Sequence, residues 1–276
     1  MTELSPSDPQ RLPRQMGERR FGRTNWLGLY TLIEREVRRF LSVWSQTVLA
    51  PVATSALFMV VFTIAFGSRR GEVQGVPFEQ FLAPGLLMMT VIQNAFANTS
   101  SSIMIAKIQG NIVDTLMPPL SAGEILIGYI AGGLIRGVVC ATVVMAVIFP
   151  WAGITPQNVL WMLWFALAGS VMMGLLGLLA AIHAQRFDQM SAITNFVITP
   201  LSFLSGTFYS ITALPEAFRA ISHINPFFYL IDGFRFGAIG ISDSSPWIGL
   251  GVTLAINVAL WLVALRWLTT GYKLKP

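Results

Sequence analysis

The sequence predicts an all-α membrane protein. We expect six transmembrane helices, an N-terminal amphipathic helix at the membrane interface, and a re-entrant outer hairpin between the fifth and sixth helices. Hydrophobic residues make up 54% of the 276 residues and charged residues only 11%, whereas about a quarter of a soluble domain is charged. Charge is also absent from several long runs, and about 20 apolar residues suffice to cross the hydrocarbon core of a bilayer.

The N-terminal region divides into two parts. Residues 1–23 are rich in Pro, Arg and Ser, and we expect a disordered cytoplasmic tail there. Over 24–45, apolar and aromatic side chains recur at helical spacing, with Arg35 and Arg38 on the opposite face. This pattern is typical of a helix that lies in the plane of the interface. A cytoplasmic extension of the first span is the alternative, although Pro51 favours a bend.

The charge-free runs place the spans. They cover residues 40–68, 80–106, 137–185, 189–215 and 244–265. The third run is too long for one helix and breaks at the turn-forming segment 150–156. Its first half extends back through Arg136 to Glu124. The predicted spans therefore lie near residues 47–67, 82–105, 124–149, 157–184, 192–213 and 247–267.

Lysine and arginine predict the orientation. Six spans put both termini on one side, where 13 of the 18 Lys and Arg residues lie, against 4 on the other side and Arg136 within a span. The positive-inside rule then places both termini in the cytoplasm of a multi-pass protein. The net charge of +5 is concentrated at the N-terminus of an apolar chain. We therefore expect the chain to interact with a lipid bilayer and not with a nucleic acid.

The segment 107–123 is the one sizeable cytoplasmic loop, and a helix is predicted over 107–119 within it. Four apolar residues repeat in it at helical spacing before a Pro-Pro pair: Ile108, Ile112, Val113 and Leu116. A short amphipathic helix of this kind needs a surface to dock against, either the membrane or a soluble partner. Ser121 and Glu124 follow with capping-box spacing. For Glu124, a helix cap and a functional contact at the membrane surface are equally good interpretations.

The segment from the fifth span to the sixth has an unusual pattern. Pro200 falls within the fifth span, and Asn225 with Pro226 separates two short apolar helices on the outer side. This predicts the re-entrant hairpin, and a tight outer loop with aromatic anchors is the alternative. The candidates for an outer gate or substrate path are Pro200, Phe203, Gly206, Phe208, Tyr209, Asn225, Pro226 and Phe228.

Catalytic motifs are missing from the sequence. It has no G-x-x-x-x-G-K-[ST] phosphate loop, no HExxH and no CxxC. Arg136 is the one ionisable residue well inside a predicted span, and such residues face a cavity or a partner. It pairs within the bundle or contacts a substrate. We expect no catalytic residue, no metal and no cofactor in this chain.

Three segments carry a family resemblance. They are Met117-Pro-Pro-Leu-Ser-Ala-Gly-Glu124, Pro200-Leu-Ser-Phe-Leu-Ser-Gly-Thr-Phe-Tyr209 and Asn225-Pro-Phe-Phe-Tyr-Leu-Ile-Asp-Gly-Phe-Arg235. With the order of the spans, they resemble the permease subunit of type-2 ABC exporters, most of all the YadH-like permeases of bacterial inner membranes. The resemblance covers about residues 25–268, within a type-2 transmembrane domain over 24–276.

The resemblance implies a division of labour. The chain would pair with a second copy and with two cytoplasmic ATP-binding cassette subunits, which bind ATP and Mg. The 107–119 helix would couple to the ATPase, with Arg35, Arg38 and Glu124 at the same junction. The first, second and fifth spans would line the path of an amphipathic, lipid-linked or drug-like cargo out of the cytoplasm. A stand-alone secondary transporter or channel is the alternative, and a membrane-embedded enzyme is a further one.

Overall fold

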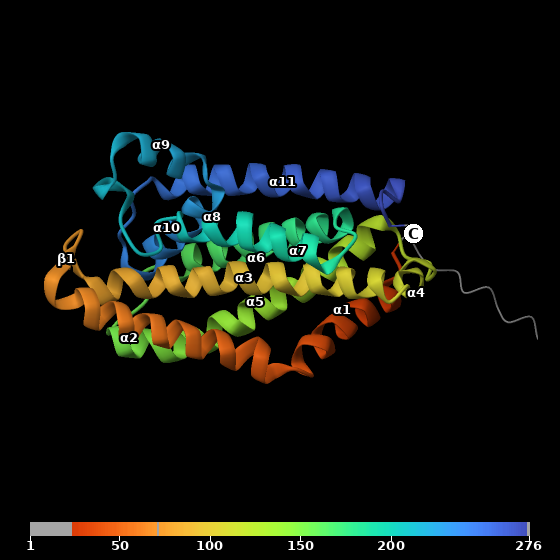
Figure 1. Cartoon of the computed structure of the whole chain (residues 1–276), viewed down its shortest axis with the longest axis horizontal. Coiled ribbons are helices and arrows are strands. Elements are labelled where there is room, and N and C mark those ends of the chain that lie inside the picture. The colour runs from red at the N-terminus through yellow and green to blue at the C-terminus, as the bar shows by residue number, and fades with distance from the viewer. Residues whose placement is uncertain (1–23, 71, 275–276) are drawn as a thin grey trace, which may run out of the picture.

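The protein is a long bundle of helices with one short β-hairpin (Figure 1). The computed structural model describes residues 24–70 and 72–274, so the predicted tail over 1–23 lies outside the described residues. The hairpin pairs β1 (Glu72–Val73) antiparallel with β2 (Val76–Pro77), with Val73 opposite Val76. In Figure 1, β1 and α9 lie at one end of the bundle, and α4 and the C-terminus lie at the other.

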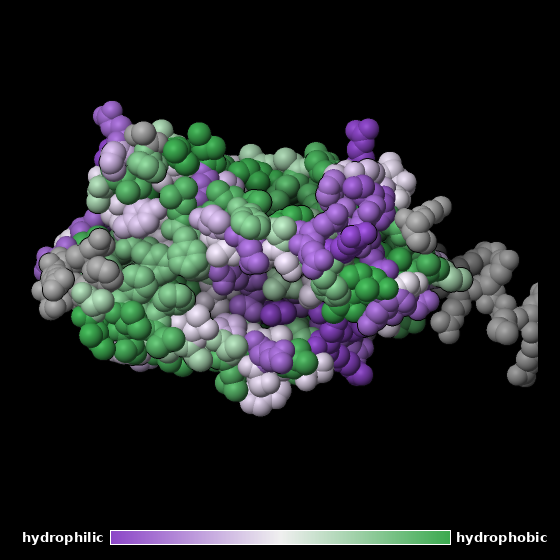
Figure 2. Space-filling view, viewed as in Figure 1, coloured by the Kyte–Doolittle hydropathy of each residue, from purple (hydrophilic) through white to green (hydrophobic). Residues whose placement is uncertain are grey.

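Five helices in the described part of the chain are long and apolar enough to cross a membrane. They are α2 (Ala50–Arg70) with the π-helical turn η1 (Ser45–Leu49) before it, α3 (Phe78–Ile108), α5 (Ala122–Ala152), α6 (Val159–His183) and α11 (Pro246–Thr270). Figure 2 shows apolar residues over much of one flank of this bundle. These helices match five of the six predicted spans.

The predicted helix over 192–213 has different bounds. A continuous helical stretch runs through α7 (Phe187–Ile193), the π-helical turn η2 (Thr194–Ile198) and α8 (Thr199–Phe203). It ends ten residues before the predicted end, because Gly206 adopts a φ of +76° and turns the chain. The 3₁₀ turn η3 (Ile211–Ala213) follows. A sixth membrane crossing through this segment stays a prediction.

Two shorter helices follow, α9 (Glu216–Ile224) and α10 (Pro226–Ile239). The side chain of Asn225 accepts a hydrogen bond from the backbone N–H of Phe227, and Pro226 occupies the first turn of α10. Gly240, at a φ of +74°, ends the helix. This is a standard start and stop for a helix. The break that the sequence predicts at Asn225 and Pro226 is thus present.

The central helix is α3, which packs against α2, α5, α6 and α10 and is buried along most of its length. Small residues let its neighbours approach closely. A Cβ atom on Gly177 of α6 would lie 2.6 Å from the backbone oxygen of Phe96. Such contacts are typical of helix packing in membranes. At the end of α3, Lys107 Nζ donates to the backbone oxygens of Ala181, Ile182 and Ala184, which joins α3 to the C-terminus of α6.

The N-terminal helix α1 (Trp26–Leu41) packs along the first part of α5 and is inclined to the long helices in Figure 1. Gly128 and Gly132 of α5 lie against Leu32 and Glu36 of α1, so any larger residue there would overlap α1. The apolar side chains predicted to share one face divide in two. Leu29 and Phe40 are buried, whereas Trp26, Tyr30 and Trp44 are exposed. The position of α1 in the membrane interface stays a prediction.

Candidate functional site

The first candidate region is the corner where α1, α4 and α5 meet, at the end of the bundle predicted to be cytoplasmic (Figure 1). The helix expected over 107–119 is in fact two elements. Ile108 is the last residue of α3, and α4 (Ile112–Leu116) has only five residues. Gly110 separates them at a φ of +73°, a conformation that favours glycine and interrupts the helix.

Hydrogen bonds hold this corner together. Arg35 Nη1 donates to Thr115 Oγ1 of α4 at 2.9 Å, and Arg35 Nη2 donates to the Tyr129 hydroxyl of α5 at 3.3 Å. The backbone N–H of Asn25 donates to Glu124 Oε1 at 2.6 Å, and the Asn25 side chain donates to the Pro119 carbonyl at 3.2 Å. The start of α1 is thus tied to the α4–α5 connection at Pro119 and to the first turn of α5 at Glu124.

Glu124 is a helix cap in this structure. The Ser121 backbone N–H donates to Glu124 Oε2 at 2.6 Å, and the Glu124 N–H donates to Ser121 Oγ at 3.3 Å, which completes the predicted capping box. Glu124 is also buried, and both of its carboxylate oxygens accept hydrogen bonds from within the chain. It therefore positions the corner. Its predicted role at an ATPase junction stays a prediction, and it would act there by holding Asn25 and Ser121 in place.

The apolar residues predicted at the corner differ in exposure. Ile108, Val113 and Leu116 are exposed, and Met117 beside them is exposed at 76%. Ile112 is buried in the core instead, so it anchors α4 and is not available to a partner. Arg38 is exposed as well and pairs with Glu34 at 2.5 Å. The corner therefore presents a small apolar surface of Ile108, Val113, Leu116 and Met117, which we call the α4 surface.

One carboxylate organises the arginines of α1. Glu36 is fully buried and lies 3.2 Å from both Arg35 Nη2 and Arg39 Nη2. Ser102 of α3 donates to its Oε1 at 2.7 Å. Arg39 Nη2 also donates to the backbone and side-chain oxygens of Asn98 at 2.7 and 3.0 Å. Buried charge is tolerated here because it is paired and hydrogen-bonded.

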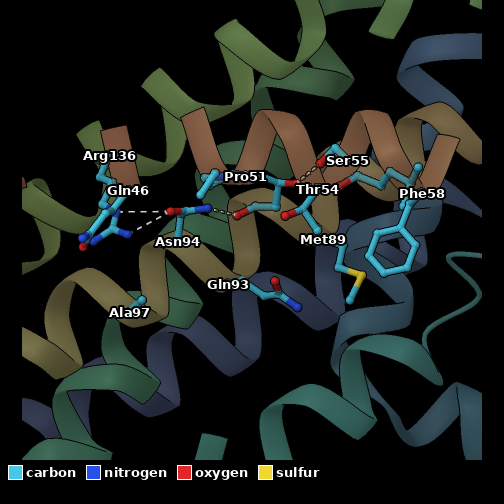
Figure 3. Close-up of a pocket in the computed structure, with 13 residues that line it drawn as sticks. Gln46, Pro51, Thr54, Ser55, Phe58, Met89, Gln93, Asn94, Ala97 and Arg136 are labelled. Carbon is cyan, nitrogen blue, oxygen red and sulfur yellow. Dashed lines mark hydrogen bonds between the residues drawn. The ribbon is translucent and has the colours of Figure 1, made fainter. Parts of the chain in front are cut away.

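The second candidate region is a cavity of about 320 Å³ between α2 and α3. Figure 3 shows Arg136 and Gln46 at one end of it, and Phe58 and Met89 at the other. Figure 2 shows a hydrophilic strip in the middle of the apolar flank, over this part of α3. The polar lining residues are Gln46, Thr54, Ser55, Thr90, Gln93, Asn94 and Arg136.

Arg136 lies near the middle of α5 and contacts Asn94 near the middle of α3. Its Nε and Nη2 atoms donate to Asn94 Oδ1 at 3.2 and 3.0 Å. Asn94 is itself oriented, since its Nδ2 donates to the Thr90 carbonyl at 3.0 Å (Figure 3). Behind them the Cys140 thiol contacts the Thr47 carbonyl, within the π-helical turn η1, at 3.0 Å. The predicted intramembrane charge therefore faces a cavity.

A second cavity, of about 340 Å³, lies between α3 and the helical stretch of α7 and η2. It shares Gln93 and Ala97 of α3 with the first cavity, and it adds Ser100 and Ser101 of α3 and Thr194 of η2. The polar side of α3 is thus bordered by α2 on one side and by the α7–η2 stretch on the other. This arrangement uses the three spans that the sequence predicts to line a path.

An aromatic cluster lies between α2 and α8. Phe208 stacks on Phe62 with ring centroids 4.8 Å apart, and on Phe203 at 5.4 Å. Its ring is 6.1 Å from that of Phe58, which also lines the cavity. Phe58, Phe62, Phe203 and Phe208 therefore form one cluster at the apolar end of the cavity.

The other gate candidates lie around this cluster. Pro200 is in the first turn of α8. Asn225 Nδ2 donates to the Leu201 carbonyl at 2.8 Å, which ties the start of α10 to α8. Phe228 is fully buried beside His223, at 5.3 Å between ring centroids, and packs with the half-buried Tyr209. Phe228 is therefore part of the packed interior and does not line the cavity.

Arg235 holds α10 to the bundle. It is 1% exposed, and its Nη2 donates to the Gly206 carbonyl at 2.7 Å and its Nε to the Phe81 carbonyl at 3.3 Å. The guanidinium lies 3.9 Å from the centroid of the Phe81 ring. Gly85 makes room, because a Cβ there would come within 3.2 Å of Arg235 Nη2. We call this set the Arg235 clamp.

Asp232 lies one turn earlier on α10, which is not among the membrane-spanning helices. It accepts hydrogen bonds from the backbone N–H groups of Asp243 at 2.7 Å and Ser244 at 2.9 Å, and it is 4.0 Å from Arg235 Nη1. Burial raises the pKa of Asp232 to about 6, against the opposing effects of Arg235 and the two amides. Gly206, a predicted gate residue, contributes through its backbone. Its positive φ forms the turn after α8, and its carbonyl accepts the hydrogen bond from Arg235 Nη2.

Sequence reasoning did not single out Glu36, Arg39, Asn94, Phe58 or Phe62. A signal existed for the contact that places Glu36, because Gly128 and Gly132 form a G-x-x-x-G pattern in an apolar helix. Asn94 and Asn98 are one turn apart in the second predicted span and are polar residues within it. The partners of these residues lie far away in sequence, so the pairing itself needed the structure.

Known proteins are similar to this chain over most of its length. Residues 28–238 match the family model described as "ABC-2 type transporter". The "Inner membrane transport permease YadH" of Escherichia coli (strain K12) is 36% identical over 250 residues, covering 91% of this chain and 98% of that protein. "Nodulation protein J" of Rhizobium leguminosarum bv. viciae is 26% identical over 254 residues, covering 88% of this chain and 93% of that protein.

Proposed function

Because the chain belongs to the ABC-2 type transporter family, we propose that it is the permease subunit of an ATP-driven exporter. Two copies would form the membrane part, and two separate ATP-binding cassette subunits would bind ATP and Mg in the cytoplasm. We place the complex in the bacterial inner membrane, with both termini of this chain cytoplasmic. This location agrees with the name of the YadH relative and with the apolar helices.

The observation that carries the proposal is the α4 surface. Val113, Leu116 and Met117 expose apolar side chains on a five-residue helix whose opposite side is held by Arg35 through Thr115. Exposed apolar patches with a polar surround mark sites of protein association. Because Arg35 is hydrogen-bonded to both α4 and α5, a partner that moves α4 would also move α5, which carries Arg136 in the cavity wall.

The cavity and the aromatic cluster support the export of an amphipathic, lipid-linked or drug-like cargo. The polar side of α3 gives a hydrophilic route in the middle of an apolar flank. The aromatic cluster would close that route at one end by apolar packing. A second copy facing α2, α3 and α8 would complete the walls of the path.

The test is co-purification from the native membrane. We expect the tagged chain to carry an ATP-binding cassette subunit and vanadate-sensitive ATP hydrolysis. Val113→Asp or Leu116→Asp places a charge in the packed contact, which is strongly unfavourable, so both variants should lose the ATPase while the permease is still inserted. Ile224→Asp is the matched control, because Ile224 is exposed at 82% at the opposite end of the bundle.

Two results would contradict the proposal. ATPase binding by the Asp variants at the level of the unmodified chain would show that the α4 surface does not couple. Transport by the purified chain in vesicles without any ATPase would instead indicate a stand-alone secondary transporter or channel. Ile112→Asp is a useful contrast, because Ile112 is buried and its replacement should prevent stable insertion.

A further inference from the structure

Arg136 is a cation without a carboxylate partner in the part of the chain that the structure describes. Its contacts are Asn94, through one neutral oxygen, and the thiol of Cys140. Among the charged groups of the described residues, the one that acts on Arg136 is Arg39, which is also a cation. A guanidinium has five N–H donors, and Asn94 uses those on Nε and Nη2 only. Arg136 therefore keeps both charge and donors available to the cavity.

A second copy of the chain does not solve this problem. The acidic residues of the described helices lie at helix ends or are already paired, as Glu34 is with Arg38 and Glu36 is with Arg35 and Arg39. No described helix carries a free carboxylate at the depth of Arg136. A pair of copies would instead bring two such arginines to one path. Within the described residues, neither copy supplies a balancing anion at this depth, so we look for it in another molecule.

The cavity shows what kind of molecule fits. Arg136, Gln46 and Asn94 make one end polar, whereas Phe58 and Met89 make the other end apolar (Figure 3). A ligand with a charged head and an apolar tail would satisfy both ends. Intramembrane arginines are costly and typically mark substrate pathways, and a guanidinium is well matched to an oxyanion.

We propose that Arg136, oriented by Asn94, binds the oxyanion head group of an amphiphilic cargo, whose apolar part lies toward Phe58 and Met89. The inference rests on the proposed transport function and narrows its cargo to anionic amphiphiles. Asn94 is a positioning residue, since its oxygen fixes the guanidinium and its own amide is held by the Thr90 carbonyl. The Glu36 network leaves Arg136 unneutralised, because its carboxylate is shared by Arg35 and Arg39.

The test measures binding to the permease alone, in nanodiscs of phosphatidylcholine. Gln93→Cys places a thiol in the cavity wall, and the native Cys140 is fully buried and gives little background. The readout is the rate at which a neutral maleimide labels residue 93. We expect dodecyl phosphate to slow the labelling, and dodecanol and dodecyltrimethylammonium to have a much weaker effect. Inorganic phosphate tests whether a small free anion suffices.

Variants separate charge from structure. Arg136→Gln should raise the half-protecting concentration of dodecyl phosphate at least about tenfold, as expected for loss of a hydrogen bond to a charged group. The half-protecting concentration for Arg136→Lys should lie between those for the unmodified chain and for Arg136→Gln. Asn94→Asp is nearly isosteric and supplies an internal carboxylate, so it should weaken binding as much as Arg136→Gln in a fully folded chain. Arg266→Gln removes an exposed arginine outside the cavity and should change nothing.

Each outcome decides the matter. Equal protection by dodecanol and dodecyl phosphate, or unchanged protection in Asn94→Asp, would overturn the oxyanion site. Equal protection by inorganic phosphate would overturn its assignment to an amphiphile. The experiment needs no ATPase, so a chain that recruits the ATPase but fails here refutes only this inference. A chain that binds dodecyl phosphate through Arg136 but recruits no ATPase refutes the exporter proposal and leaves the site intact.

Discussion

Replacing Arg235 with Met should destabilise the protein strongly. The substitution removes the hydrogen bonds to the Gly206 and Phe81 carbonyls and the contact with the Phe81 ring, and methionine refills only part of the volume. A hydrogen bond to a charged group is worth about 1.5–3 kcal/mol, and a desolvated cation–π contact about 2 kcal/mol. These losses overlap, so we expect about 3–5 kcal/mol, the range for breaking a buried ion pair.

The loss should depend on pH through Asp232. Without Arg235, the Asp232 carboxylate lacks its nearest cation. Its pKa is already about 6, and removal of a cation raises it further. Protonation then removes the unpaired charge, so Arg235→Met should cost less at pH 5 than at pH 8. The double variant Arg235→Met with Asp232→Asn should therefore be more stable than Arg235→Met alone at pH 8.

Thermal unfolding in nanodiscs, followed by tryptophan fluorescence, measures these differences. At about 2 °C or more per kcal/mol for a chain of this size, Arg235→Met should lower the Tm by at least about 6 °C. Arg219→Gln is the control, because that arginine makes an exposed hydrogen bond to the Thr212 carbonyl. Its Tm should change little. Equal Tm values for the two variants would refute the clamp.

Three other predictions concern orientation, closure and packing. A cysteine at residue Glu216 should be labelled by an impermeant reagent from outside intact cells and one at Asn111 should not, and the reverse result would invert the topology. Phe208→Ala opens the aromatic cluster, so it should raise ion leak or uncouple ATP hydrolysis from export at normal expression. Reduced expression with unchanged transport per folded molecule would instead show that the ring only anchors the segment. Gly132→Ala forces a Cβ to within 2.5 Å of α1, whereas Gly123 has open space around it. Gly132→Ala should therefore lower the Tm and Gly123→Ala should not, and equal Tm values would mean that α1 is not packed there.

Sequence reasoning reached the long helices because their signal is local. An apolar run of the right length predicts a membrane helix whatever its neighbours are. The capping box at Ser121 and Glu124 is equally local, and the structure confirms it. The predicted bounds of the helices near Phe203 and Gly110 were wrong, because apolar periodicity does not show where the backbone turns. Apolar periodicity continues past both points, but the backbone turns there, at Gly206 and at Gly110 itself.

The main feature that sequence reasoning could not predict is which charged residues of α1 are buried. A helical wheel of α1 places Arg35 and Arg38 on one polar face, but it does not tell which of them turns inward. The structure buries Glu36, which then orders Arg35 and Arg39, while Arg38 stays outside with Glu34. The partner Ser102 is 66 residues away in sequence. Only the packing of α1 against Gly128 and Gly132 brings these groups together.

The two π-helical turns have a mechanical consequence. η1 precedes α2 on one side of the polar strip of α3, and η2 precedes α8 on the other, so Gln46 and Thr194 each line a cavity from within such a turn. A π turn holds one residue more than an α turn. Closing it into an α turn moves the following helix by one residue step, about 100° of rotation and 1.5 Å of rise. The helix on each side of the polar strip thus follows one extra residue, and closing that π turn would rotate the side chains that this helix turns toward the cavity.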